Sequence, residues 1–207
     1  MKYLAEIGRS LKRNPVKTCR HDRVPWKGDF LAEGADGKAF QSLDDETKVV
    51  KIGFIGNMVR SLYSMNDLED NFDYIHTHNP AAYVTVHNYS CINCRDCNIG
   101  YFVVMDKLVP IGGNAQNVVA LANQVQSLVN NKKRKNEKFP TASIHAGYLS
   151  GVKEIEFAKA IWTSGIIHND IHYGNVMKTT GGDYKLIDLD RLTFTKFAEK
   201  DEEDDDE

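Results

Sequence analysis

The stretch that most constrains this chain is residues 165–190, where turn-forming residues alternate with short apolar runs. It places His168, Asp170 and Asn175 in one loop, and Asp188 follows the next apolar run. Such spacing suits phosphoryl transfer, in which one carboxylate is aimed at an acceptor hydroxyl while an Asn and a second carboxylate hold metal ions. Ordinary turns also collect these residue types. Three residues at fixed offsets and a second acid behind an apolar run favour the site.

The loop follows the order His-x-Asp-x-x-x-x-Asn, which resembles the catalytic loop of the protein-kinase-like superfamily. The resemblance implies that Asp170 orients or deprotonates the acceptor and that Asn175 holds a metal ion. It implies that Asp188 is the metal-binding aspartate that opens the Asp-Phe-Gly motif, with ATP and Mg²⁺, or Mn²⁺, as cofactors. The implied fold is α+β, with two lobes and a minimal, truncated C-terminal lobe.

Two glycines follow a short apolar segment early in the expected first lobe. Gly34 and Gly37 lie three residues apart. Glycine lets the backbone approach a phosphate without a side chain in the way. A plain hairpin turn is the simpler alternative, and the downstream motifs favour a nucleotide-binding loop.

Lys51 interrupts a β-branched run, where it alternates with Val50 and Ile52. A lysine inside a buried strand must find a partner, because desolvating its charge costs free energy. The resemblance implies that Lys51 has two kinds of partner, which are the α- and β-phosphates of ATP and a glutamate from the next helix.

Apolar residues at helical spacing predict that next helix over residues 61–76. Within it, Glu69 is the expected partner of Lys51. Asp67 and Asp70 are rivals for the ion pair, and each acid fits an ordinary exposed helix charge equally well.

Residues 82–90 and 100–108 are predicted to be strands, and the second runs from apolar residues into charge. This end resembles the last upper-lobe strand of a kinase as it enters the hinge between lobes. By that resemblance Met105 lines the back of an adenine pocket, and the backbones of Asp106 and Leu108 hydrogen-bond the base.

Two further helices are predicted in the second half of the chain, over residues 115–130 and 152–164. The second has Ser150 as its candidate cap and Gly165 as its end. It leads directly into the loop that holds Asp170, as the long lower-lobe helix of a kinase does.

Three cysteines lie between the two predicted strands at the spacing Cys-x-x-Cys-x-x-Cys. Three thiolates make three quarters of a structural zinc site. The residues are Cys91, Cys94 and Cys97, with Cys19, His21 or His87 as candidates for the fourth ligand. Because there is no second Cys-x-x-Cys pair, reduced cysteines on a hairpin tip are favoured over bound Zn²⁺.

The net charge of −3 hides an asymmetry along the chain. Residues 199–207 carry eight acids and one lysine, so that the remaining residues sum to +4. This like-charge block is expected to be a disordered tail that aids solubility, with a pseudo-substrate or partner-binding role as the alternative. The basic run 132–138 is expected to be a solvated loop rather than a nucleic-acid-binding surface.

The sequence has no apolar run long enough to cross a membrane and no export signal. With four cysteines, the expected compartment is the reducing cytoplasm, which is the host cytoplasm if the chain is viral. Leu4, Ile7 and Leu11 predict a first helix, which we expect to pack against the body rather than on a membrane.

The chain after Asp188 is too short for the segments with which eukaryotic protein kinases bind peptides. Only residues 189–198 separate Asp188 from the tail, and no Ala-Pro-Glu sequence follows. His172 also stands where a protein-serine kinase has lysine. Choline and aminoglycoside kinases tolerate these departures but need a larger second lobe for their substrate.

The chain is more similar to the early serine/threonine kinase of T-odd bacteriophages. The likeness lies in residues 30–40, in the lysine strand that ends in Gly53-Phe54, and in Asp-x-His-x-Gly-Asn at 170–175; it spans about residues 30–195. It implies phosphorylation of Ser and Thr in host proteins and in the enzyme itself. Those enzymes carry a basic C-terminal extension, whereas this chain ends in an acidic tail, so no role of that extension is carried over.

Two further side chains have expected roles near the transferred phosphate. His172 is expected to replace the missing lysine by hydrogen-bonding the γ-phosphate, best when protonated, so that activity rises towards mildly acid pH. Asp190 is a candidate ligand for a second metal ion, with a salt bridge to Arg191 or Lys185 as the alternative.

The expected organisation is an N-terminal lobe over residues 1–109, a reduced C-terminal lobe over 110–198 and a tail over 199–207. The expected activity is that of a protein serine/threonine kinase. A small-molecule kinase of the aminoglycoside or choline type and a nucleotide-binding pseudokinase module are the alternatives.

Overall fold

The computed structural model describes residues 28–34, 37–54, 65–94, 99–133 and 135–198. Over these ranges the fold is α+β, with three α-helices and antiparallel sheets, which confirms the expected fold class at that level. The helix expected near the N-terminus and the acidic tail lie outside the described residues.

The chain divides into two compact units. The first holds the described residues up to Asn79 together with Thr85–Lys107. The second holds Pro80–Val84 together with the chain from Leu108 onward.

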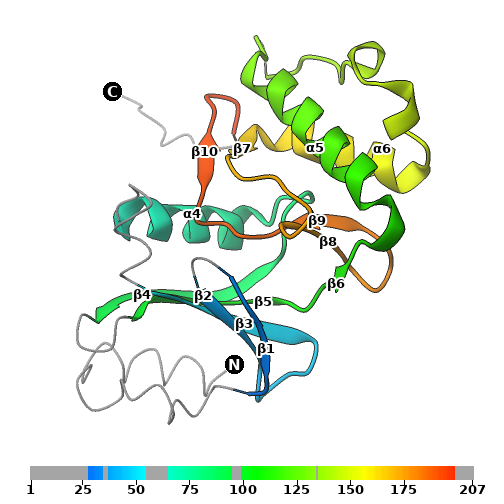
Figure 1. The fold of residues 1–207 in the computed structure, drawn as a ribbon. Coiled ribbons are helices and arrows are strands. Elements are labelled where there is room, and N and C mark those ends of the chain that lie inside the picture. Colours follow the sequence, from blue (N-terminus) through cyan, green and yellow to red (C-terminus); the bar gives the residue numbers. More distant parts are fainter. Residues whose placement is uncertain (1–27, 35–36, 55–64, 95–98, 134, 199–207) are drawn as a thin grey trace, which may run out of the picture. The chain divides into compact units, whose positions relative to one another are not determined.

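The first unit is a five-stranded antiparallel sheet with one helix against it (Figure 1). Neighbouring strands follow the order β1-β2-β3-β5-β4. The elements are β1 (Phe30–Glu33), β2 (Gly37–Gln41), β3 (Lys48–Phe54), α4 (Met65–His78), β4 (Val86–Cys94) and β5 (Ile99–Asp106).

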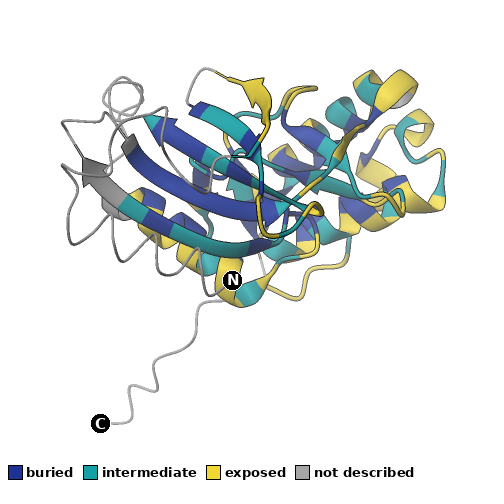
Figure 2. Cartoon of the chain, turned by 90° about the horizontal axis from the view of Figure 1, so that it is seen from below, coloured by how far each residue is buried: buried dark blue, intermediate teal, exposed yellow. Residues whose placement is uncertain are grey.

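β-Branched residues account for the central strands of this sheet, because they pack well on a pleated surface. Val50 and Ile52 on β3 and Val103 and Val104 on β5 are at most 4% exposed. Figure 2 shows β5 buried along most of its length and β3 with buried and half-buried residues, while β1 is exposed.

α4 buries one face against the sheet. Leu68, Phe72 and Ile75 recur every three or four residues and are at most 1% exposed. The Phe72 ring lies 5.2 Å from that of Tyr101 on β5, measured between centroids. The helix ends at His78, two residues later than expected, and its expected first turn lies outside the described residues.

The second unit combines two packed helices with small antiparallel sheets (Figure 1). One sheet has the strand order β6-β8-β9 and the other pairs β10 with β7. The elements are β6 (Val109–Pro110), α5 (Ala115–Asn130), α6 (Val152–Ser164), β7 (Ile166–His168), β8 (Val176–Lys178), β9 (Tyr184–Leu186) and β10 (Leu192–Phe194), with 3₁₀ turns at Gly112–Asn114, Thr141–Ser143 and Ala146–Tyr148.

The bounds of α5 and α6 agree with those expected from hydrophobic periodicity. Gly165 ends α6 with a φ of 65°, and a Cβ there would lie 2.6 Å from the backbone nitrogen of Ala198. The expectation that Ser150 caps α6 is wrong, because the cap residue is Gly151, which makes no side-chain bond. None of the helices in the described ranges has the length and apolar character needed to span a bilayer.

The segment Pro80–Val84 belongs to the second unit, although the sequence placed it in the first lobe. The Val84 amide donates to the Leu186 carbonyl of β9 at 2.9 Å. Tyr83 is fully buried, and its hydroxyl donates to the Ile166 carbonyl of β7 at 3.2 Å. These partners are about a hundred residues away in sequence, so local hydropathy does not reveal them.

Lys132 is part of the core, unlike the solvated loop expected for residues 132–138. It is 8% exposed, and its Nζ donates to the carbonyl of Trp162 at 3.3 Å and lies 4.8 Å from the centre of the Trp162 ring. Burial lowers the pKa of this ammonium group, and the α6 carboxyl end and the aromatic face partly offset the cost of burying it. Residues 133 and 135–138 are exposed as expected.

We expect Tyr184→Phe to destabilise the protein and to flatten its loss of stability in alkali. The Tyr184 hydroxyl donates to Oε1 of Glu154 at 2.9 Å, and Glu154 is only 9% exposed. Burial, followed by this hydrogen bond, raises the pKa of Tyr184 from 10.0 to about 12. The fold therefore favours the neutral phenol, so this stabilisation is complete below pH 10.0 and is lost as the pH rises towards about 12.

Removing the hydroxyl should cost about 2 kcal/mol at neutral pH, because a buried carboxylate loses a partner. Urea unfolding of wild type and variant between neutral pH and pH ~11 measures both effects. Tyr173→Phe is the control, since Tyr173 is 79% exposed. Equal midpoints and equal pH slopes for wild type and Tyr184→Phe would contradict the assigned hydrogen bond.

Candidate functional site

A buried histidine holds the loop between β7 and β8. His168 is 3% exposed; its Nδ1 accepts the Asp170 amide proton at 3.2 Å, and its Nε2 lies 2.6 Å from the Ile187 carbonyl oxygen. Because Nδ1 accepts, the ring proton is on Nε2 and is donated to Ile187. One neutral imidazole therefore ties the loop of Asp170 to the residue that precedes Asp188.

The strand that leads into this loop is fixed from α5. Gln126 is 6% exposed; its Oε1 accepts the His168 amide proton at 2.9 Å, and its Nε2 donates to the Ile166 carbonyl at 3.2 Å. No motif in the sequence singles out Gln126. Its one signal there is a polar side chain on the apolar face of a predicted helix.

Asn175 joins the loop to the strand that precedes Asp188. Its Nδ2 donates to the Asp170 carbonyl at 2.9 Å, and its own carbonyl accepts the Ile187 amide at 3.0 Å. The nitrogen of the side-chain amide is used in this bond, so Oδ1 is the atom that can ligate a cation. Within the second unit, the structure therefore brings Asn175 next to Asp170 and next to Ile187, the residue that precedes Asp188.

Asp188 has a left-handed backbone, with a φ of 67°. This conformation costs roughly 1–2 kcal/mol for most residues and is least unfavourable for Asn and Asp. Strain of this kind concentrates at functional sites. The backbone of Asp188 is thus consistent with a role for its carboxylate beyond packing.

Two nitrogen side chains approach the Asp170 carboxylate at the same oxygen. Arg191 Nη1 lies 3.3 Å and His172 Nε2 lies 4.0 Å from Asp170 Oδ2. The sequence offered Arg191 only as a partner for Asp190. Its place beside Asp170 follows from strand pairing, which no local pattern signals.

His172 presents its Nε2 towards the carboxylate, because its Nδ1 accepts the Gly174 amide proton at 3.0 Å. The neutral ring therefore already carries its proton on Nε2. A second proton would displace the Gly174 amide from Nδ1. This geometry gives no support to the expected rise of activity towards acid pH.

Lys51 lies on the sheet face that α4 covers. Directly opposed residues of antiparallel strands share a face, and Lys51 pairs with Val103 as Gly53 pairs with Tyr101. Tyr101 contacts α4, and Val103 pairs in turn with Tyr89 on β4. Lys51, Val103 and Tyr89 therefore form a row across the sheet beneath α4.

Glu69 and Asp73 lie one turn apart on α4, near the β4 end of this row. Asp73 accepts a hydrogen bond from the Tyr89 hydroxyl at 2.5 Å. Burial, then this bond and the charges of Asp73 and Glu69, raise the pKa of Tyr89 above its ordinary range. The charge of Glu69 thus raises the pKa of Tyr89, which lies in the same row as Lys51. Glu69 as the partner of Lys51, with Asp67 and Asp70 as rivals, stays a prediction.

Gly34 and Gly37 differ in what surrounds them. The Gly34 amide donates to the Gly37 carbonyl at 2.9 Å, as in a hairpin turn, and residues 35–36 lie outside the described ranges. A Cβ on Gly37 would lie 2.1 Å from the Ile52 carbonyl oxygen, so packing on β3 already requires this glycine. A Cβ on Gly34 would meet no described atom within 4 Å.

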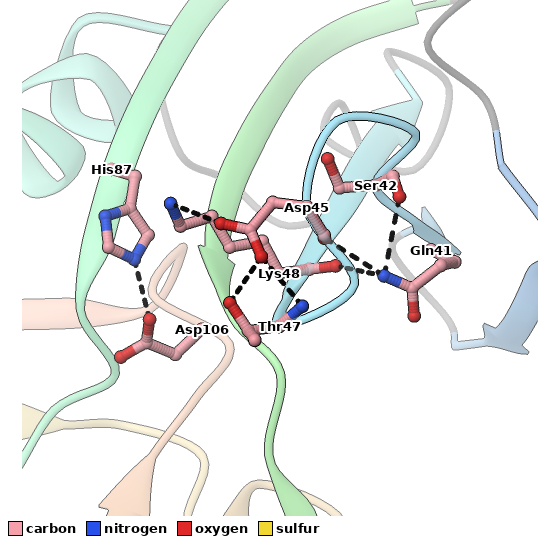
Figure 3. Close-up of polar contacts among 7 residues, drawn as sticks. All are labelled: Gln41, Ser42, Asp45, Thr47, Lys48, His87 and Asp106. Carbon is pink, nitrogen blue, oxygen red and sulfur yellow. Dashed lines mark hydrogen bonds and ion pairs between the residues drawn. The ribbon is translucent and has the colours of Figure 1, made fainter.

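The turn between β2 and β3 is organised around Asp45 (Figure 3). Its Oδ1 accepts the Thr47 amide at 2.9 Å and the Thr47 hydroxyl at 2.5 Å, and its Oδ2 lies 2.9 Å from Lys48 Nζ. The Thr47 hydroxyl, followed by Lys48, holds the pKa of Asp45 well below its usual range. Gln41 Nε2 donates to the carbonyls of Asp45 and Lys48, at 3.2 and 2.9 Å.

The end of β5 meets this turn at the segment expected to bind adenine. His87 Nε2 lies 2.6 Å from Asp106 Oδ1 (Figure 3), and the Asp106 amide donates to the Thr85 carbonyl at 3.2 Å. Asp106 can therefore offer a base its carbonyl but not its amide. The first unit ends at Lys107, and Leu108 continues into the second.

Among the described residues, no group of three or more His, Cys, Asp or Glu side chains is arranged to hold a metal ion. The pair Asn175 and Asp188 includes only one side chain of these four types. Such a pair can still suit Mg²⁺, because Mg²⁺ sites commonly use one or two carboxylates and complete the shell with phosphate and water. Of the zinc candidates, Cys91 is half-buried on β4, while Cys19, His21 and Cys97 lie outside the described residues. The preference for reduced cysteines over bound Zn²⁺ stays a prediction.

No protein-family model matches the chain, and no curated protein matches it. The resemblance to kinases therefore depends on the motifs and contacts given above.

We expect Gly34→Ala and Gly37→Ala to separate a ligand role from a packing role. Gly34→Ala should leave the free energy of unfolding within about 0.5 kcal/mol of wild type but raise the Kd for ATP several-fold, because its methyl group meets only the ligand. Gly37→Ala should unfold more easily, because its methyl group meets the β3 backbone. Isothermal titration with Mg-ATP measures ATP binding, and urea unfolding measures stability. Unchanged ATP binding in Gly34→Ala would show that the loop does not contact the nucleotide.

Proposed function

We propose that this chain is an ATP-dependent phosphotransferase with a two-lobed, protein-kinase-like fold, which phosphorylates Ser and Thr in proteins, itself included. The observation that carries the proposal is the set of four hydrogen bonds linking His168, Asp170, Asn175 and Ile187. In this proposal Asp170 supplies the acceptor-orienting carboxylate, and Asn175 and Asp188 supply an amide oxygen and a second carboxylate for metal ions. The second unit would be the catalytic lobe and the first the nucleotide lobe.

Asp170 takes the role of positioning the acceptor hydroxyl and receiving its proton. As the hydroxyl oxygen bonds to the γ-phosphorus of ATP, the bond from that phosphorus to the bridging oxygen breaks and ADP leaves. His172 donates from Nε2 to a γ-phosphate oxygen in its neutral form. Such a reaction depends on positioning and charge neutralisation more than on covalent help from the protein.

The donor atoms fit Mg²⁺. Asn175 Oδ1 and the Asp188 carboxylate are hard oxygen ligands of the kind that Mg²⁺ prefers, and Mn²⁺ accepts the same atoms. When bound, the metal ion neutralises charge on the phosphates. Asp190 is the candidate ligand for a second ion.

The first unit supplies the nucleotide contacts in this proposal. Lys51, steadied by Glu69, holds the α- and β-phosphates, and Gly34 lets the backbone pass close to them. The Asp106 carbonyl and the Leu108 backbone bind the adenine base. A kinase-type site requires these residues to meet those of the second unit around one nucleotide.

A protein acceptor, rather than a cationic small molecule, is proposed from the motifs at Gly53-Phe54 and at residues 170–175, which resemble those of the bacteriophage enzymes. Host proteins as substrates rest on the resemblance to the bacteriophage enzymes alone, and the presence of all four polar positions argues against a pseudokinase.

The proposal is tested by incubating the protein with Mg-ATP and a mixed protein substrate and measuring intact masses. The wild type should gain about 80 Da per phosphoryl group. Asp170→Asn should lower turnover by about 10²–10⁴-fold with ATP binding retained, and Asp188→Asn should abolish Mg²⁺-dependent turnover. Asn tolerates the left-handed backbone of residue 188, so stability should change little.

Asp183→Asn is the matched control, because Asp183 is an exposed acid of the same unit that pairs with Lys153 at 2.5 Å. It should keep full activity. Phosphoryl transfer that persists in Asp188→Asn, or ATP binding that is lost in Asp170→Asn, would refute the assigned roles. Faster turnover with choline or an aminoglycoside than with protein would move the substrate to the small-molecule class.

A further inference from the structure

Arg191 reaches the catalytic loop because of the register between β10 and β7. Leu192 pairs with His168 in this ladder, so the residues beside them, Arg191 and Asn169, are also adjacent. The Asn169 amide and its Nδ2 both donate to the Arg191 carbonyl, at 2.8 and 3.1 Å, and Nδ2 also donates to Thr193 Oγ1 at 2.9 Å. The backbone of Arg191 is therefore fixed to the residue that precedes Asp170.

The side chain of Arg191 completes a set of contacts around Asp170. Its Nη1 lies 3.3 Å from Oδ2, while the Asp170 amide is held by His168 and its carbonyl by Asn175. His172 Nε2 lies 4.0 Å from the same oxygen, beyond hydrogen-bond distance, so its N–H stays available for the γ-phosphate.

We propose that Arg191 is a positioning residue for phosphoryl transfer, holding Asp170 Oδ2 so that Oδ1 receives the acceptor hydroxyl. This inference rests on the proposed function. In the reaction the acceptor proton passes to Oδ1 as the acceptor oxygen bonds to the γ-phosphorus and ADP departs. Arg191 exchanges no proton; it restricts the carboxylate to one orientation, and geometry of this kind governs the rate of a positioned reaction.

The alternative is an ordinary surface ion pair. The side chains of Arg191 and Asp170 are 31% and 35% exposed, and pairs with such exposure contribute little to stability. The two explanations differ in what the variants change. A positioning role lowers kcat and leaves stability and ATP affinity nearly as they were, whereas an ordinary ion pair changes none of them appreciably.

The test measures kcat, the KM for ATP and the melting temperature of Arg191→Met and Arg191→Lys, with Lys153→Met as the matched control. Lys153 forms an exposed ion pair with Asp183 in the same unit, outside the loop. Arg191→Met should lower kcat about 10–100-fold, with KM for ATP within about twofold and a melting temperature like that of Lys153→Met. Arg191→Lys should recover part of the rate, and added guanidinium should partly restore Arg191→Ala.

A double-mutant cycle with Asp170→Asn completes the test. If Arg191 acts through Asp170, Arg191→Met should not slow Asp170→Asn further. A normal kcat for Arg191→Met, or losses that multiply in the double variant, would overturn the inference. The proposed function would still stand if the wild type is active and Asp170→Asn is slowed as expected. A wild type that transfers no phosphoryl group overturns both.

Discussion

The neutral imidazole of His168 is the interaction on which the second unit's site depends. It is buried, accepts from the Asp170 amide and donates to the Ile187 carbonyl, so that one ring fixes the spacing between two loops. A buried polar group must have its hydrogen bonds satisfied, and here both ring nitrogens are used. The Gln126 side chain on α5 fixes the strand that carries the ring. The placement of Asp170, Asn175 and Asp188 follows from these bonds.

The same reliance on backbone partners extends through the second unit. The Tyr83 hydroxyl donates a hydrogen bond to the Ile166 carbonyl, and the Asn169 amide donates one to the Arg191 carbonyl. Each of these contacts holds a short strand of three residues that could not persist alone. Small strands around a loop can thus be rigid when side chains from helices and neighbouring segments complete their hydrogen bonds.

Local patterns predicted the elements, and contacts between distant residues decided the details. The period of apolar residues and the glycine at 165 gave α6 its observed bounds, and the alternation around Lys51 marked a central strand. Three features depend on contacts between residues far apart in the chain. Lys132 is buried, residues 80–84 belong to the second unit, and Arg191 lies beside Asp170. No window of sequence contains both partners, so these features became visible only in the structure.

The proposed function requires Lys51 and the loop of Asp170 to bind one nucleotide. A crystal structure with Mg²⁺ and a non-hydrolysable ATP analogue tests it most directly. We expect Asn175 Oδ1 and an Asp188 oxygen at about 2.0–2.1 Å from the metal ion, with Lys51 Nζ hydrogen-bonded to the α- or β-phosphate of the same nucleotide. A nucleotide bound elsewhere, or one held by Lys51 with its metal ion away from Asp188, would contradict the proposed kinase site.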